Sequence, residues 1–97
     1  MEKRSLSDGR KFSLKAPVRE VMLEGRSITV HGLYFEGGQQ LTLQPGEASF
    51  QVLEGDASFT GSEGTERARK GNIVIGEVNL IENLGGGLLV ILETRSK

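Results

Sequence analysis

The sequence predicts a small all-β domain, a sandwich or barrel built from short strands. Fourteen glycines and two prolines interrupt the 97 residues at short intervals. Between these breaks, runs of about five to nine residues alternate apolar and polar side chains, a pattern typical of strands with one buried face. No stretch has the apolar spacing of a long amphipathic helix. Short strands joined by glycine-rich turns, without crossover helices, favour an all-β architecture.

Turn signals divide the chain into successive strands. The strongest are Pro45-Gly46 and Glu54-Gly55-Asp56, because proline and glycine favour the dihedral angles of tight turns. Residues 61–64 are typical of a hairpin tip, and residues 85–87, three glycines, indicate a mobile or sharply bent connection. The expected strands are residues 27–35, 39–44, 48–52, 57–60, 65–70, 73–75, 79–83 and 88–92. The last strand is apolar on both faces, so we expect it to be covered from both sides.

Residues 1–26 are less regular than the rest of the chain. Residues 17–23 fit either a helical turn, because Val18, Val21 and Met22 fall at helical spacing, or a strand. We expect residues 1–26 to pack on or across a barrel formed by residues 27–97, within a single domain of residues 1–97. A chain of this size buries a limited share of its surface, so a second subunit is a natural source of further burial.

Charge and composition exclude several classes of function. The formal net charge is −1, with 12 basic and 13 acidic side chains, so no global basic field exists to hold nucleic acid or an anionic membrane. The absence of cysteine excludes disulfides, thiolate zinc sites and cysteine nucleophiles. The longest apolar run, residues 88–92, is far too short to cross a bilayer, and residues 1–15 lack the apolar core of a signal peptide. We therefore expect a cytoplasmic protein.

Two groups of short segments in the chain resemble a known pair of sequence motifs. Pro45-Gly46-Glu47 and residues 52–57, Val-Leu-Glu-Gly-Asp-Ala, form one set. Residues 71–75, Gly-Asn-Ile-Val-Ile, and Asn83 form the other. Together they resemble the first and second sequence motifs of the cupins, over about residues 33–94. The resemblance implies a cupin-like double-stranded β-helix, that is, a jelly-roll barrel.

The resemblance also indicates where a metal would be held. Cupins keep two histidines and a glutamate in the first motif and a histidine in the second, and these fall on Thr42, Gln44, Ala48 and Asn79. A divalent metal prefers imidazole nitrogens or carboxylate oxygens, which a hydroxyl, two carboxamides and a methyl do not supply. A shift of the motif alignment by one residue would place Glu47 at a ligand position. The Glu47 side chain would then lie on the opposite face of the strand. We therefore expect no metal and no other cofactor.

The same alignment places a candidate ligand site in the mouth of the barrel. The expected ligand-binding residues are Thr42, Gln44, Phe50 and Asn79, with the three polar side chains supplying hydrogen bonds and Phe50 flooring the cavity. A concave, mostly apolar cavity with a few convergent polar groups is the usual site for a small ligand. Alternatively, Gln44 and Asn79 hydrogen-bond each other or the backbone and fill a vestigial cavity. The main hypothesis is a non-catalytic protein of unknown specific function that binds a small polar molecule or serves as a dimeric accessory module.

The alternative hypothesis is a metal-dependent isomerase or oxygenase with an atypical ligand set. That set would be His31, Gln44, Glu47 and Asn79. The only histidine is His31, and the only tyrosine is Tyr34; some metal-free cupin epimerases pair such residues as base and acid. Positions 31 and 34 have opposite parity, so in a regular strand they face opposite ways, which argues against a shared acid–base site.

A homodimer is the expected assembly. Cupins commonly pair through an outer sheet face, and the resemblance implies the same here. In this reading Leu41, Leu43 and Leu53 lie on the face opposite the expected pocket. A small barrel cannot bury both faces of every strand by itself, so the amino-terminal segment or a partner subunit must cover them.

Overall fold

The computed structural model describes residues 1–97 as an all-β structure without helices, as the sequence predicts. Its strands are β1 (Val18–Glu24), β2 (Ile28–Phe35), β3 (Gln40–Thr42), β4 (Glu47–Glu54), β5 (Asp56–Gly61), β6 (Gly64–Arg69), β7 (Ile73–Asn83) and β8 (Leu89–Ser96). Hydrogen bonds connect seven strands in the order β1-β2-β8-β4-β7-β5-β6, and β3 pairs with β7. No helix capable of spanning a membrane is found.

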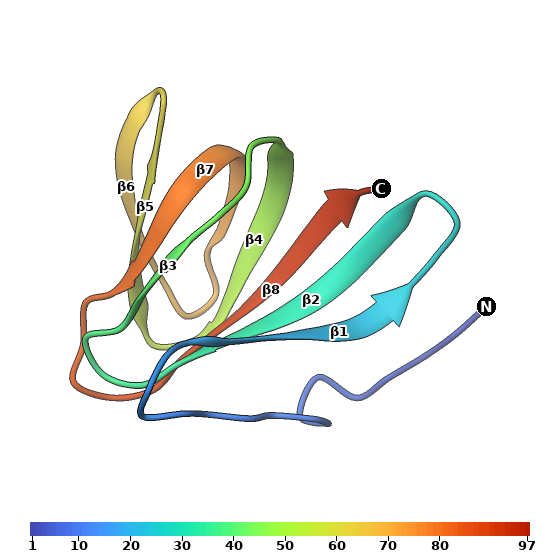
Figure 1. Ribbon diagram of the computed structural model, residues 1–97, viewed down its shortest axis with the longest axis horizontal. Helices are drawn as coiled ribbons and strands as arrows, with labels where there is room; N and C mark the ends of the chain where they lie inside the picture. Colours follow the sequence, from blue (N-terminus) through green and yellow to red (C-terminus); the bar gives the residue numbers. More distant parts are fainter.

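The paired strands fold over into two sheets that face each other (Figure 1). Sheet A contains β1, β2, β8, β4 and the first part of β7, whereas sheet B contains β3, β5, β6 and the rest of β7. The long strand β7 joins the sheets, because residues 73–77 pair with β4 and residues 78–83 pair with β5. The sequence predicted two short strands in this region, and the structure has one continuous strand instead.

Alternation along each strand decides which side chains fill the space between the sheets. On β2, Leu33 and Phe35 point inward, and on β4, Phe50 and Val52 do the same; each is at most 1% exposed. Removing such side chains from water is the dominant favourable contribution to folding. The core consists of Leu33, Phe35, Leu43, Ala48, Phe50, Val52, Ala57, Phe59, Ala68, Val78, Ile81, Leu89 and Ile91.

The leucines of β3 and of the turn after it also face this core, which corrects one sequence-based prediction. Leu43 is 8% exposed and Leu41 packs against the core, whereas Thr42 and Gln44 are exposed. The prediction that Thr42 and Gln44 share the inner face was therefore wrong. The chain bends between β3 and β4, where Gly46 has a φ of +125°. This bend interrupts the alternation, so the parity of β4 cannot be carried back to β3.

The amino-terminal part of the chain supplies an edge strand and a covering segment. Residues 18–24 form β1, which pairs with β2, so the strand alternative holds and the sheet extends beyond the boundary expected at residue 27. The preceding segment runs alongside β1 (Figure 1). Phe12 packs edge-on against Tyr34, with ring centroids 5.5 Å apart, and Arg10 pairs with Glu54 at 3.4 Å.

The turn between β4 and β5 requires glycine at position 55. Gly55 has a φ of +95°, and a β-carbon there would lie 2.5 Å from the carbonyl oxygen of Leu88 and 3.0 Å from the Cα of Leu89. Gly71 is a matched control, because its φ is +93° and its surroundings are open. We expect Gly71→Ala to lower the free energy of unfolding by about 1–2 kcal/mol through backbone strain alone. Gly55→Ala should lose about 1–3 kcal/mol more through overpacking.

Urea unfolding followed by circular dichroism measures both losses. Equal losses for the two variants would contradict a steric requirement at Gly55.

Candidate functional site

The strongest candidate site is a group of ionisable side chains on the inner face of sheet A. Glu93 of β8 is 0% exposed. Arg19 of β1 and Arg95 of β8 each place Nη2 2.9 Å from one of its carboxylate oxygens. His31 of β2 lies directly across from Glu93, with its Nδ1 3.6 Å from Oε1. We call these four residues the Glu93 cluster.

Strand alternation places the cluster on the same face as the apolar core. On β8, Glu93 continues the inward-facing series of Leu89 and Ile91 toward the carboxyl end of the strand. His31 precedes Leu33 in the same way on β2. The cluster therefore forms a polar layer next to the core, and burial in that layer makes its hydrogen bonds and charges strongly interdependent.

Both oxygens of the Glu93 carboxylate accept hydrogen bonds. Arg19 donates Nε and Nη2 to Oε1 at 3.2 and 2.9 Å, and Arg95 donates Nε and Nη2 to Oε2 at 3.3 and 2.9 Å. The Nη1 group of Arg95 also donates to the carbonyl oxygens of Pro45 and Gly46, at 3.3 and 3.2 Å. Arg95 thereby fastens the turn before β4 to the buried carboxylate.

The environment of His31 favours the neutral imidazole near pH 7. Burial lowers its pKa below the ordinary value of 6.5, and the positive charge of Arg19 lowers it further. The negative charge of Glu93 acts against these effects and raises the pKa of His31. Both oxygens of that carboxylate already accept hydrogen bonds from the two arginines. The Nδ1 atom of His31 is buried and has no hydrogen-bond partner.

The lowered pKa of His31 predicts a pH dependence of stability. The unfolded chain binds the proton more tightly than the folded chain, so stability falls as the pH drops below 6.5 and through the lowered pKa. We expect His31→Gln to lose less stability than the wild type between about pH 7.5 and about pH 5. Urea unfolding at both pH values measures the difference. NMR titration of this single histidine gives its pKa directly, and a pKa at or above 6.5 would contradict the prediction.

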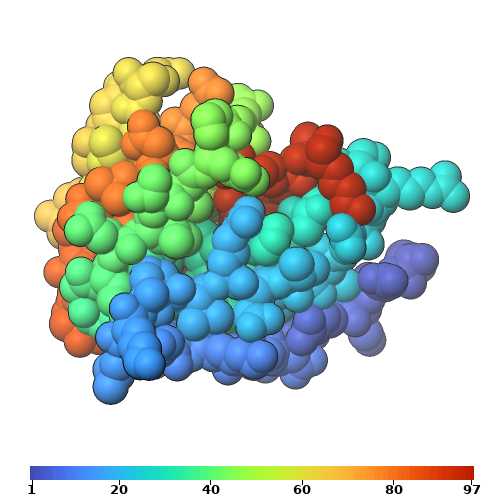
Figure 2. Space-filling model, viewed as in Figure 1, coloured from blue at the N-terminus to red at the C-terminus, as the bar shows by residue number.

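A crevice lies beside the Glu93 cluster, between sheet A and the chain around β3. It encloses about 230 Å³. In Figure 2 the atoms of β1, in blue, lie against the green chain of β3 and the turn after it. The lining residues are Arg19, Leu41, Thr42, Leu43, Gln44 and Arg95. We call this cavity the Arg19–Arg95 crevice; two arginines, a threonine and a glutamine are among the residues that line it.

The structure brings only two of the four predicted site residues together. Thr42 and Gln44 line the crevice. Phe50 is 0% exposed and packs in the core with its ring 5.4 Å from that of Phe59. Asn79 is an exposed residue at a bulge of β7, where the pairing with β5 shifts register, and its backbone carbonyl accepts a hydrogen bond from the Leu43 N–H at 2.9 Å.

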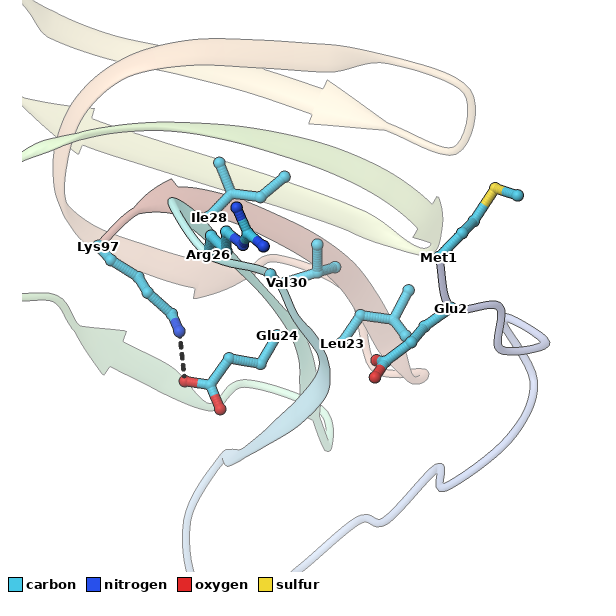
Figure 3. A pocket seen from close by; sticks show the side chains of 9 residues that line it. Met1, Glu2, Leu23, Glu24, Arg26, Ile28, Val30 and Lys97 are labelled. Atoms are coloured by element: carbon cyan, nitrogen blue, oxygen red, sulfur yellow. Dashed lines mark ion pairs between the residues drawn. The ribbon is translucent and has the colours of Figure 1, made fainter.

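A larger groove lies on the outer side of the β1–β2 hairpin (Figure 3). Its volume is about 680 Å³, and its walls include Leu23, Ile28 and Val30 together with the first two residues of the chain. Glu24 and Lys97 form an ion pair of 3.1 Å beside it. The polar groups of this groove do not converge on a buried charge, so the crevice is the better candidate for specific binding.

The fold is shared with solved structures whose sequences differ widely from this one. The sequence matches no protein-family model and no curated protein. An uncharacterized double-stranded β-helix protein from Klebsiella pneumoniae is 21% identical, with a TM-score of 0.85 over 99% of this chain and 90% of that one. An RmlC-like cupin protein from Desulfovibrio desulfuricans is 20% identical, with a TM-score of 0.79 over 98% of this chain and 96% of that one.

This protein has the cupin fold. A further structure, of a Thermus thermophilus protein, is 13% identical and matches with a TM-score of 0.87 over 99% of this chain and 98% of that one. At such identities the likeness is one of fold, and it confirms the jelly-roll architecture that the turn motifs predicted.

Three residues of the alternative metal-ligand set, His31, Glu47 and Asn79, lie in different surroundings. His31 lies on the inner face of sheet A, Glu47 is exposed on β4, and Asn79 is exposed on β7. His31 and Glu47, two members of the alternative ligand set, therefore face opposite sides of sheet A. No three His, Cys, Asp or Glu side chains lie close enough together to hold a metal ion.

His31 and Tyr34 do not form an acid–base pair. His31 faces Glu93 on the inner side of sheet A, whereas Tyr34 packs against Phe12 of the amino-terminal segment. Burial raises the pKa of Tyr34 above its ordinary value of 10, so the phenol stays protonated. The prediction that the two residues face opposite ways is confirmed.

Sequence reasoning missed three members of the Glu93 cluster. The parity of Leu89 and Ile91 extends to Glu93 and Arg95, so alternation alone could have placed both on the inner face. Arg19 carried no such signal, because its partner is 74 residues away in the sequence. Pairing of β1 and β8 with opposite edges of β2 brings them together.

Proposed function

We propose that this cupin-fold protein is a non-catalytic, metal-free module that binds a small polar molecule in the Arg19–Arg95 crevice. The observation that carries the proposal is that two arginines line one cavity together with Thr42 and Gln44. Few, well-placed polar groups in a concave site are the usual means of orienting a small ligand. A volume of about 230 Å³ suits a ligand smaller than a typical drug molecule.

The donor chemistry supports a non-catalytic, metal-free role. Guanidinium groups are protonated at all ordinary pH values and cannot coordinate a cation. The one buried carboxylate of the site already accepts hydrogen bonds from both arginines. The residues lining the crevice therefore offer hydrogen bonds and positive charge, and they include no carboxylate, imidazole or thiol.

Titration of the protein with small polar molecules, followed by two-dimensional ¹H–¹⁵N NMR, tests the proposal. The panel contains carboxylates, phosphate, amides and sugars. At least one member should cause saturable shifts at residues 41–44 and at the side chains of Arg19 and Arg95. Thr42→Ala and Gln44→Ala should weaken that binding, and Ser62→Ala, at the exposed hairpin tip, should not.

Two results would overturn the proposal. One is a panel that produces no saturable shifts, or shifts centred on the groove of Figure 3. The other is a transition metal found by elemental analysis at one equivalent per purified chain.

We also propose a homodimer formed through the outer face of sheet A. On this face Ile73 and Ile75 are 68% and 72% exposed, and they pair with the uncharged residues Gln51 and Ser49 of β4. Thr94 continues the uncharged surface on β8. Depletion of charge is typical of the centre of a protein–protein interface. A cytoplasmic location without nucleic-acid or membrane partners stays a prediction from the sequence.

Light scattering coupled to size-exclusion chromatography tests the homodimer. The wild type should have twice the chain mass, and Ile75→Lys should have the mass of one chain. A wild-type mass of a single chain at all concentrations would contradict the dimer.

A further inference from the structure

We infer that the ligand of the Arg19–Arg95 crevice is a small oxyanion, bound through the guanidinium groups that also hold Glu93. This inference rests on the proposed function and adds the chemical class of the ligand. It follows from the charge of the Glu93 cluster, from its unused hydrogen-bond donors and from the size of the cavity.

The cluster carries an excess positive charge. Arg19 and Arg95 supply two positive charges, Glu93 supplies one negative charge, and His31 is neutral. Neither arginine forms an ion pair with any other carboxylate. The side chain of Arg95 is only 11% exposed, so water compensates its charge poorly. An anion in the crevice would supply the missing negative charge.

The donors of Arg19 are suited to such an anion. Its guanidinium uses Nε and Nη2 for Glu93, while Nη1 makes no hydrogen bond to that carboxylate. The side chain is 34% exposed and lines the crevice, so a ligand can reach it. The planar arrangement of N–H groups on arginine matches the spacing of carboxylate and phosphate oxygens. Thr42 and Gln44, whose side chains can donate neutral hydrogen bonds, also line the crevice.

His31 makes the affinity for the oxyanion depend on pH. The charged groups that act on its ring are Arg19 and Glu24 of β1 and Glu93 and Arg95 of β8. Protonation of the ring adds a second excess positive charge to the cluster. Binding of an anion should therefore strengthen as the pH falls and His31 becomes charged.

Sulfate is the probe, because it stays a dianion over the pH range in which His31 titrates. ¹H–¹⁵N spectra are recorded against sodium sulfate, against sodium chloride at equal ionic strength, and against uncharged dimethyl sulfone. Sulfate alone should give saturable shifts at residues 41–44 and at both arginine side chains. Affinity should increase on acidification in the wild type and not in His31→Gln.

Variants at Arg19 separate a specific site from general attraction. Arg19→Gln should weaken sulfate binding at least about tenfold, since it removes a charged hydrogen-bond donor. Arg19→Lys keeps the charge without the planar donors and should bind with intermediate affinity. The matched control is Arg67→Gln, which removes an exposed arginine paired with Asp56 and should leave the affinity unchanged.

The possible failures are distinguishable. Saturable binding of dimethyl sulfone or another uncharged molecule in the crevice, without binding of sulfate, would overturn the oxyanion and leave the proposed function intact. The absence of any binding in the crevice would overturn both. Equal weakening by Arg19→Gln and Arg67→Gln would show non-specific attraction and contradict the inference.

Discussion

Replacing Glu93 with alanine is expected to lower the free energy of unfolding by about 3–5 kcal/mol, because it leaves buried positive charge without a partner. Glu93 is 0% exposed and accepts hydrogen bonds from both Arg19 and Arg95. The control is Glu54→Ala, which breaks a partly exposed pair with Arg10 and should cost about 0–1 kcal/mol. Urea unfolding followed by circular dichroism gives both values.

Sulfate should reveal the electrostatic origin of that loss. An anion bound in the crevice can replace part of the missing negative charge, so sulfate should stabilise Glu93→Ala more than it stabilises the wild type. Sodium chloride at the same ionic strength is the reference. A loss of stability no larger in Glu93→Ala than in Glu54→Ala would mean that the cluster does not stabilise the fold.

Replacing Phe50 with alanine is expected to lower the free energy of unfolding by about 3–5 kcal/mol, through lost burial and the cavity left behind. Phe50 is 0% exposed and packs against Phe59 and the rest of the core. Phe50→Leu retains most of the apolar volume and should cost less. Denaturant unfolding of the two variants measures the difference.

Ligand binding distinguishes this core role from the pocket role expected from the sequence. Phe50 does not line the crevice, so Phe50→Leu should bind sulfate with unchanged affinity. Weak destabilisation together with lost binding would instead assign Phe50 to the ligand site.

Local patterns predicted the strands but only part of the candidate site. Alternation and turn residues are encoded by neighbours in the sequence, and they placed β2, β4, β5 and the hairpin tip before β6. The same reasoning failed across the bend at Gly46, because the alternation of β4 does not continue back into β3. Leu41 and Leu43 face the core, whereas Thr42 and Gln44 are exposed. It failed again at β7, where Asn79 lies at a bulge and stays exposed.

The sequence by itself determined the all-β class and the turn at residues 54–56. Each of these depends on residue types at short spacing. Only the tertiary structure decided that Arg19, His31, Glu93 and Arg95 form one buried cluster. Their contact depends on three strands, β1, β2 and β8, that pair in space although β8 is far from the others in the chain. This pairing removes the Glu93 carboxylate from water and places it beside its two arginine partners.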